Sequence, residues 1–197
     1  MLIALWRSAR EAVSLGGLAN SGDERKEWFQ AAEQYARQAV TANPEGVDGR
    51  LWLAVSVGRL ALTEGPRGKV RLAIEIREHA LATLQLDSLN SGAHHVLGEW
   101  HAEIRRLSGV TRWAARRFLG ADVFDEASWE RAEHHLTQAV ASDPNTATHQ
   151  LDLARLYLDL DRRDEAEVHL RRVLELPATD PEDAMHKEQA QELLGGS

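Results

Sequence analysis

The chain has 197 residues, of which 43 % are hydrophobic and 27 % charged, a composition that is ordinary for a soluble globular protein. Its formal net charge of −8 argues against general nucleic-acid binding, and the lack of cysteine excludes disulfides and thiolate chemistry. No run of about 20 apolar residues is present, so no transmembrane segment is expected. Met1–Trp6 is too short for a secretory leader, and we expect a cytoplasmic location for the chain as numbered, from which a targeting segment could have been trimmed.

Two helices are expected near the start of the chain. The first covers Leu2–Leu15 and ends at Gly16-Gly17, because glycine is a poor helix former. The second follows Ser21, which begins a capping-box pattern, and runs to about Thr41. Residues 1–24 are therefore predicted to be an N-terminal helix and loop that precede the repeated part of the chain.

Three further helices are predicted before residue 108. Val47–Thr63 is apolar nearly all round, which is typical of a helix buried on most sides. A Gly-Pro turn within Glu64–Gly68 ends it, and Val70–Leu86 forms the next helix. A third helix begins at Asn90 or Ser91 and reaches about Leu107.

Small, large and proline residues recur at a fixed spacing in the second half of the chain. The recurring positions are Ala132 and Ala166, Leu136 and Leu170, each pair 34 residues apart, with Pro144 matched by Pro44. This is the period of the tetratricopeptide repeat, whose unit is a pair of antiparallel helices. Small residues lie where the two backbones approach, large ones fill the space between pairs, and proline stops the second helix.

One unit of the repeat is interrupted. Leu97-Gly98 matches the Leu-Gly positions of a third copy, but 46 positions separate Gly98 from Pro144 where a plain repeat has 24. The surplus falls in residues 108–127, which we expect to contain a short helix over about Thr111–Leu119. The later helices are predicted at Trp129–Ala141, Thr146–Leu160, Arg163–Leu176 and, capped by Asp180, over residues 181–194 as a closing helix.

The whole chain is expected to form one all-α domain. No segment shows the period-two alternation of a strand. The predicted fold of residues 1–197 is a tetratricopeptide-repeat helical solenoid of nine or ten helices, with an insertion in its third unit. Because one unit cannot bury its apolar face alone, neighbouring units must stack on it.

The order of these features resembles a particular family. The stretch Ser91–His101, which reads SGAHHVLGEWH, is similar to a motif of the regulator of microtubule dynamics family, and the insertion after it fits the same pattern. Segments Ala132–Pro144 and Ala166–Pro177 and the closing helix extend the resemblance over roughly Trp28–Leu194. The resemblance implies a tetratricopeptide helical domain. It also implies links to microtubules for eukaryotic members, and to organelle contacts and phospholipid binding for some.

The repeat register predicts a concave groove, because the first helix of each unit lines the inside of such a solenoid. The groove residues are expected to be Leu53, Val57, Leu60, His95, Glu99, Ala102, Leu151, Arg155 and Leu158. Most are apolar, and the Lys and Asn side chains with which some tetratricopeptide domains grip acidic peptides are absent. The groove is expected to hold a peptide or helix of a protein partner or, as the alternative, a lipid or other apolar small molecule, unless the insertion or closing helix fills it.

A second candidate site is a stretch without Asp or Glu from Ile104 to Ala121. It carries five arginines inside a chain of net charge −8, which favours docking to an acidic surface such as tubulin or anionic lipid headgroups. The arginines of this patch are Arg105, Arg106, Arg112, Arg116 and Arg117. Trp113 and Phe118 lie among them and either insert at an interface or close the end of the solenoid.

Catalytic and metal-binding patterns are weak. His94 and His101 are seven residues apart, so they share a helix face, but no HExxH spacing occurs, and packing roles are expected for them. Ser21, Ser91 and Ser128 precede helical runs and are expected to cap helices. We therefore expect no catalytic residues, no metal site, no cofactor and no nucleic-acid partner. The predicted function is that of a non-catalytic interaction scaffold.

Overall fold

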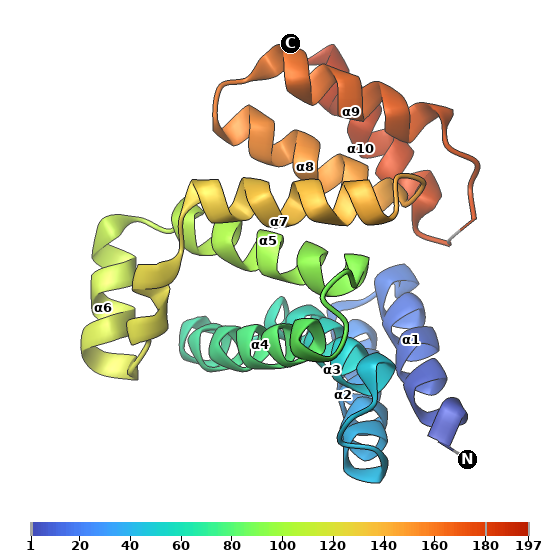
Figure 1. Ribbon diagram of the computed structural model, residues 1–197, viewed down its shortest axis with the longest axis vertical. Helices are drawn as coiled ribbons and strands as arrows, with labels where there is room; N and C mark the ends of the chain where they lie inside the picture. Colours follow the sequence, from blue (N-terminus) through green and yellow to red (C-terminus); the bar gives the residue numbers. More distant parts are fainter. Residues whose placement is uncertain (1, 180, 197) are drawn as a thin grey trace.

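The computed structural model describes residues 2–179 and 181–196, and within these ranges ten α-helices and one short 3₁₀ helix succeed one another without a strand (Figure 1). The helices of the first half are α1 Leu2–Leu18, α2 Gly22–Ala42, α3 Val47–Ala61, α4 Pro66–Leu86 and α5 Ser91–Arg106. Those of the second half are α6 Gly109–Leu119, η1 Asp122–Glu126, α7 Trp129–Ser142, α8 Ala147–Asp159, α9 Arg163–Glu175 and α10 Asp183–Gly195. None of the described helices is both long and apolar enough to cross a membrane.

The helices pack in pairs, which confirms the predicted all-α solenoid. The pairs are α1 with α2, α3 with α4, α5 with α7, and α8 with α9, while α10 packs on α8 and α9 (Figure 1). The insertion is made of α6 and η1, which separate the two helices of the third pair in sequence and lie to one side of it. The interrupted unit is therefore complete in space although it is split along the chain.

Polar caps begin several helices, and two of them, Ser21 and Ser128, lie at positions expected from the sequence. The capping side chains are Ser21, Asn90, Ser108 and Ser128, each of which accepts a hydrogen bond at 3.0–3.1 Å from the backbone N–H three residues on. Such a cap typically stabilises a helix by about 1 kcal/mol. Asn90 is thus the cap of α5 and Ser91 its first residue, so the helix begins at one of the two expected positions but the expected capping role of Ser91 is wrong.

Two expected helix boundaries in the first half of the chain are wrong. The pair Gly16-Gly17 lies inside α1 instead of ending it. A Cβ on Gly16 would lie 2.4 Å from a ring carbon of Phe29, and one on Gly17 would lie 1.7 Å from Oε1 of Glu182. These glycines therefore permit close approach of α2 and of the C-terminal region. The helix expected at Val70 begins at Pro66, because proline fits the first turn of a helix.

The closing helix also begins later than expected, at Asp183, and the predicted cap Asp180 lies outside the described residues.

The same backbone geometry recurs at the ends of α2 and α7, the second helices of their pairs. The N–H groups of Asn43 and Asp143 both donate to the carbonyl four residues back at 2.9 Å. The carbonyl of Pro44 then accepts from Nε of Arg50, and that of Pro144 accepts from Nε2 of Gln150. Residues of α3 and α8 that differ by a hundred in number therefore occupy equivalent sites, which fixes the register of α3 against α8.

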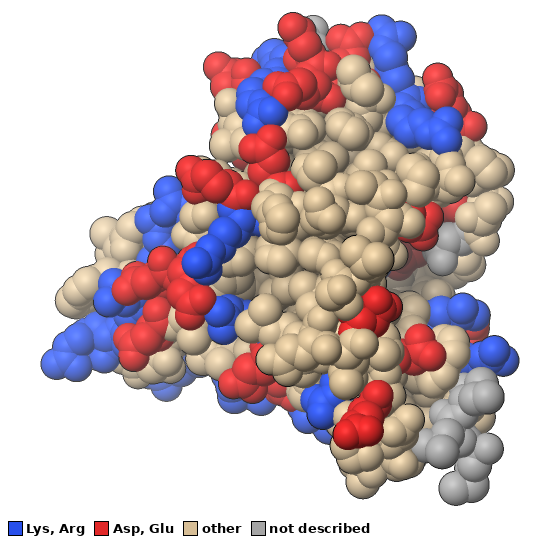
Figure 2. All heavy atoms as spheres, viewed as in Figure 1, with Lys and Arg blue, Asp and Glu red and all other residues tan. Residues whose placement is uncertain are grey.

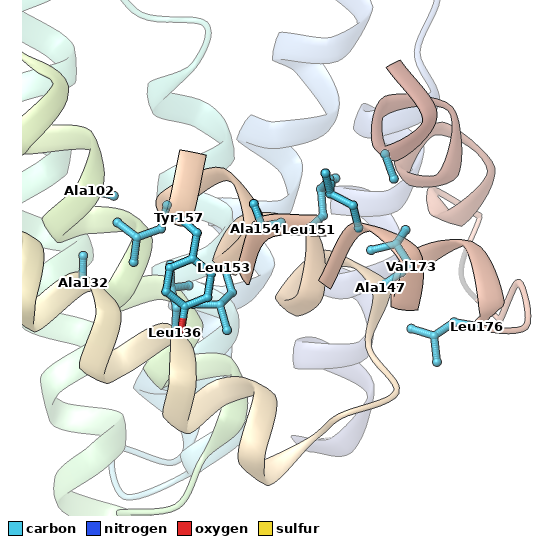
Figure 3. Close-up of a cluster of buried hydrophobic side chains, with 14 residues drawn as sticks. Ala102, Ala132, Leu136, Ala147, Leu151, Leu153, Ala154, Tyr157, Val173 and Leu176 are labelled. Carbon is cyan, nitrogen blue, oxygen red and sulfur yellow. The ribbon is translucent and has the colours of Figure 1, made fainter. Parts of the chain in front are cut away.

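The largest core cluster lies between α5, α7, α8, α9 and α10 (Figure 3). Ala132 and Leu136 on α7 and Ala154 on α8, all fully buried, are the residues that the repeat places at helix contacts. Tyr157 packs beside Leu136 in the same cluster (Figure 3). Burying a Leu side chain contributes about 1.5–3 kcal/mol, so the stacked units stabilise one another mainly here.

The two ends of the solenoid meet. The start of the α10 region returns toward α1 and α3 (Figure 1), where Nη2 of Arg59 lies 2.7 Å from Oε2 of Glu182. A cavity of about 610 Å³ at this junction is lined by Phe29, Leu62 and Met185, among others. We call the surface that carries His95, Glu99, Arg155 and Leu158 the inner face. It is bounded by the C-terminal helix as well as by the repeat units.

Candidate functional site

A chain of polar contacts crosses the inner face from α5 through α8 to α10. Nε2 of His95 lies 2.8 Å from Oδ2 of Asp152, whose Oδ1 accepts a hydrogen bond from Nη1 of Arg155 at 2.8 Å. Nη2 of Arg155 in turn donates to Oε1 of Gln189 at 2.9 Å. Three helices that belong to different structural units are therefore joined by side chains that share one surface.

Asp152 is the centre of this chain of contacts. It is buried, and burial alone would raise the pKa of its carboxyl group. The hydrogen bond from His95 and the positive charge of Arg155 outweigh that effect and hold the pKa of Asp152 below its usual value. The carboxyl is therefore ionised at neutral pH and positions both of its partners.

Glu99 lies one helical turn beyond His95 on the same face of α5. Its Oε1 is buried and accepts no hydrogen bond among the described residues, while Oε2 lies 3.8 Å from Nη1 of Arg106. Burial, followed by the nearby charge of Asp152, raises the pKa of Glu99 well above its usual value, and Arg106 only partly offsets this. Glu99 thus offers a hydrogen-bonding oxygen that the described residues leave unused.

The outer end of the same face is closed by Arg106. Its Nη2 lies 2.6 Å from Oδ2 of Asp159 on α8, and its Nη1 lies 2.5 Å from Oε1 of Glu103. Burial would lower the pKa of Arg106, but the hydrogen bond to Asp159 and the charge of Glu99 raise it above the ordinary arginine value. Arg106 is therefore a permanent cation that ties α5 to α8.

His149 borders the polar chain on its buried side. Its ring lies 4.8 Å from that of His95, centroid to centroid. Burial, together with the charge of His95, lowers the pKa of His149 to about 4. The ring is consequently neutral at physiological pH and packs as an aromatic group.

Only part of the predicted groove faces the inner surface. His95, Glu99, Arg155 and Leu158 are partly exposed there. Ala102 and Leu151, which were expected in the groove, are instead fully buried and belong to the large core cluster (Figure 3).

The predicted placement of Leu53, Val57 and Leu60 in the groove is wrong. All three are buried in a core cluster with residues of α1, α2 and α4. The expected register of α3 is off by two residues, because Ala54 lies ten residues after Pro44 just as Ala154 lies ten residues after Pro144. These three residues therefore stabilise the core and do not line a groove.

Sequence reasoning missed Asp152, Gln189 and Asp159, which complete the polar face. Asp152 is a single carboxylate within the apolar run Leu151–Ala154. A buried charge is costly unless it is paired, so this residue type at this place signals a partner on a neighbouring helix. Nothing in the local pattern of Gln189 or Asp159 marks them, because each acts through a residue that is distant in sequence.

Four histidines gather at the contact between α5 and α7 instead of at a metal site. Nδ1 of His94 lies 2.9 Å from Nδ1 of His135, and the ring of His101 stacks on His135 at 5.8 Å. His134 lies at the edge of this cluster. Burial lowers the pKa of both His101 and His135 to about 4. The described residues contain no group of three or more side chains placed to hold a metal ion.

One ring nitrogen of His94 has its hydrogen-bond role set by a backbone carbonyl. Nε2 of His94 lies 3.1 Å from the carbonyl of Ser88, which can only accept, so this nitrogen carries the proton. Nδ1 of His94 and Nδ1 of His135, 2.9 Å apart, share one hydrogen bond. The two rings therefore act as structural groups that join the paired helices.

The five patch arginines do not form one surface. Arg106 belongs to the inner face, and Nη1 of Arg112 donates to the carbonyls of Arg105 and Leu107 at the end of α5. Arg116 forms an ion pair with Asp125 at 2.8 Å.

The other two arginines lie against aromatic rings. The guanidinium of Arg105 lies 5.9 Å from the ring centre of Trp129, and that of Arg117 lies 5.8 Å from the ring of Phe118. Only the α6 part of the patch, Arg116 and Arg117, is well exposed beside exposed aromatic residues.

Comparison with known proteins identifies relatives over nearly the whole chain. A family model described as "Regulator of microtubule dynamics protein 1-3" matches residues 2–196. Regulator of microtubule dynamics protein 1 from Bos taurus is 26 % identical over 194 residues, which cover 98 % of this chain and 61 % of that protein. Regulator of microtubule dynamics protein 3 from Bos taurus is 25 % identical, over 96 % of this chain and 40 % of that protein. The chain thus spans less than two thirds of the length of either relative.

Solved structures share the fold. TTC0263, described as a thermophilic TPR protein of Thermus thermophilus, superposes with a TM-score of 0.62 at 21 % identity and covers 97 % of this chain and 83 % of that one. MamA gives a TM-score of 0.50 at 16 % identity, over 90 % of this chain and 96 % of the other. At these identities the likeness concerns the fold alone, and it confirms the predicted tetratricopeptide-repeat architecture.

Proposed function

Because the chain belongs to the regulator of microtubule dynamics family, we propose that it is a non-catalytic interaction scaffold that holds a peptide or helix of a protein partner against its inner face. The supporting observation is the carboxyl group of Glu99, whose Oε1 is buried on this face and accepts no hydrogen bond among the described residues. Leaving such an oxygen unsatisfied costs roughly 1–3 kcal/mol. A donor from a partner recovers this cost when the carboxyl group, whose side chain is partly exposed, turns toward it.

The charge of the inner face selects the chemistry of that donor. Four carboxyl groups, those of Glu99, Glu103, Asp152 and Asp159, stand against the two guanidinium groups of Arg106 and Arg155. The excess of acid complements a partner segment that carries a Lys or Arg side chain. When such a cation approaches, Glu99 gives up its proton and becomes its ionic partner.

The lipid alternative loses its motivating observation. It rested on an apolar groove, but Leu53, Val57, Leu60, Ala102 and Leu151 are all buried in the core. Of the predicted groove residues, those that stay partly exposed are His95, Glu99, Arg155 and Leu158, and three of these four are polar, which suits a peptide better than an acyl chain.

The proposal is tested by selecting displayed random peptides against the purified protein and measuring their affinities by titration calorimetry. Selected peptides are expected to be rich in Lys or Arg. Glu99→Gln, which keeps the shape but not the charge, should weaken their binding about tenfold. Binding to the wild type should tighten as the pH rises through the elevated pKa of Glu99, since the proton no longer has to be displaced.

The matched control is Glu167→Gln on the exposed side of α9, which should leave affinity unchanged. Co-pelleting with assembled microtubules is included because the relatives' names concern microtubule dynamics. Selected peptides without basic residues, or equal affinities for wild type and Glu99→Gln, would contradict the proposed site.

A further inference from the structure

α6 turns its apolar side away from the protein. Val110, Trp113 and Phe118 are 76 %, 58 % and 68 % exposed, whereas the buried residue among those described in this helix is Ala115. An ordinary surface helix does the reverse and presents apolar residues to the core. Contiguous exposed apolar side chains on a soluble protein commonly mark an interaction site.

These side chains share one face of the helix. Val110, Trp113 and Arg117 follow one another at spacings of three and four residues, which places them in line along α6. The ring of Phe118 meets that of Trp113 edge-on at 5.7 Å, and the guanidinium of Arg117 lies 5.8 Å from the Phe118 ring centre. We call Val110, Trp113, Arg117 and Phe118 the α6 outer face.

The charged side chains of α6 are all positive. No Asp or Glu occurs between Ile104 and Ala121. Arg117 forms no ion pair within the described part of the chain, while Arg116 is paired with Asp125. Asp122 borders the hollow that Trp113, Arg116 and Arg117 line. The outer face therefore combines aromatic rings with a cation that forms no ion pair among the described residues, and Asp122 is the acid that shares its hollow.

The position of α6 decides what it can touch. The helix projects from the side of the repeat stack (Figure 1), and the outermost edge of this region is tan and blue, with red spheres set farther in (Figure 2). A projecting convex helix provides no second wall for a peptide, but it reaches a flat surface before the rest of the molecule does. The strongly negative remainder of the chain would be repelled by an anionic surface and stay clear of it.

We propose that the α6 outer face docks this protein reversibly onto an anionic lipid bilayer, with Trp113 and Phe118 at the headgroup boundary and Arg117 against lipid phosphates. Helices that lie in a membrane interface combine Trp and Phe with basic residues in this way. Basic residues near an anionic leaflet add attraction that falls off within a Debye length. A single short helix gives weak binding that depends on salt, and this inference is independent of the inner face.

The test is flotation of the full chain with two kinds of vesicle, phosphatidylcholine alone and phosphatidylcholine mixed with phosphatidylserine. The wild type should float only with the anionic vesicles, and added salt should release it. Both Trp113→Ala/Phe118→Ala and Arg117→Glu should weaken binding about tenfold. These side chains are exposed, so the variants should melt like the wild type, which circular dichroism verifies.

Matched controls distinguish the α6 outer face from general surface properties. Leu89→Ala/Val168→Ala removes two comparably exposed apolar side chains elsewhere, and Arg163→Glu reverses an exposed charge on α9. Both should bind vesicles like the wild type. Equal binding of wild type and α6 variants, or no preference for anionic vesicles, would overturn the proposal.

Two further outcomes would assign the face to another occupant and also overturn it. Binding of polyglutamate that depends on Arg117, without vesicle binding, would indicate an acidic protein. A dimer in sedimentation velocity that Trp113→Ala/Phe118→Ala converts to monomer would indicate a second copy of this chain.

Discussion

Gly98 of α5 lies so close to Leu136 of α7 that a Cβ on the glycine would come within 2.5 Å of Leu136 Cγ and 3.0 Å of the Leu136 backbone nitrogen. A flexible side chain could move aside, but a backbone atom in a neighbouring helix cannot move without displacing that helix. The contact therefore requires glycine, and it holds together the unit whose helices are separated by an insertion.

We predict that Gly98→Leu destabilises the fold strongly and Gly98→Ala by about 1–3 kcal/mol, the usual cost of overpacking. Urea unfolding monitored by circular dichroism measures both. Gly22→Ala is the control, because a Cβ there meets nothing within 4 Å and alanine favours the helix. An unchanged midpoint for Gly98→Ala would mean that α5 and α7 pack less tightly than described.

Acid is predicted to destabilise the protein between about pH 6.5 and pH 4. Burial lowers the pKa values of His101, His135 and His149 to about 4, while the unfolded chain has ordinary histidines. The unfolded state therefore binds more protons in this window, so the free energy of unfolding falls as the pH falls. Urea titrations at several pH values measure the slope, and stability that stays flat or rises on acidification would refute it.

Glu99 has the opposite effect on the pH dependence of stability, which allows the histidine prediction to be checked with a variant. Its raised pKa means that the folded state holds a proton that the unfolded state has lost, so Glu99 adds to the stability of the fold as the pH falls toward the pKa of an unfolded glutamate. Glu99→Gln removes this compensation. The acid-induced loss of stability should consequently be steeper in Glu99→Gln than in the wild type, as the same urea titrations would measure.

Val57→Asp and Leu151→Asp are each predicted to unfold the protein. Both side chains are fully buried, so the aspartate would be placed in the core without a partner. Thermal melts by circular dichroism test this. Leu62→Asp is the control because Leu62 is exposed at the end of α3, and its melt should stay near that of the wild type. If the Val57→Asp variant instead folded and melted cooperatively, Val57 would lie in the groove as the sequence predicted and not in the core.

Gly17→Ala is predicted to loosen the junction between the two ends of the solenoid. The added methyl group would lie 1.7 Å from Oε1 of Glu182, so Glu182 has to leave its position against α1 and its ion pair with Arg59 weakens. Hydrogen–deuterium exchange should rise in α10 and stay constant in α5. Exchange in α10 that matches the wild type would show that the junction adapts without opening.

The sequence by itself determined the helical architecture, because the repeat is encoded by local features. Ala132 and Leu136 recur at the 34-residue spacing of a helix pair, and small residues at such positions mark close contacts between helices. The caps Ser21 and Ser128 act within one helical turn, so they could be recognised without knowing the fold, whereas Ser91 was expected where Asn90 is the cap and Ser108 was not recognised. The interruption of the third unit was likewise visible as surplus residues.

The inner face was decided by the tertiary structure. An apolar helix such as α3 has no polar side to reveal its orientation, and a shift of two residues moved Leu53 and Val57 from the groove into the core. In the network through Asp152, His95 contacts a residue 57 positions later in the chain, and Arg155 contacts Gln189, 34 positions later. No local sequence pattern contains contacts over such separations. The patch arginines were divided for the same reason. An arginine is available to a partner only if folding brings no carboxylate or carbonyl beside it. Folding brings Asp159 of α8 to Arg106 of α5, and such a pairing depends on how helices pack and not on sequence spacing.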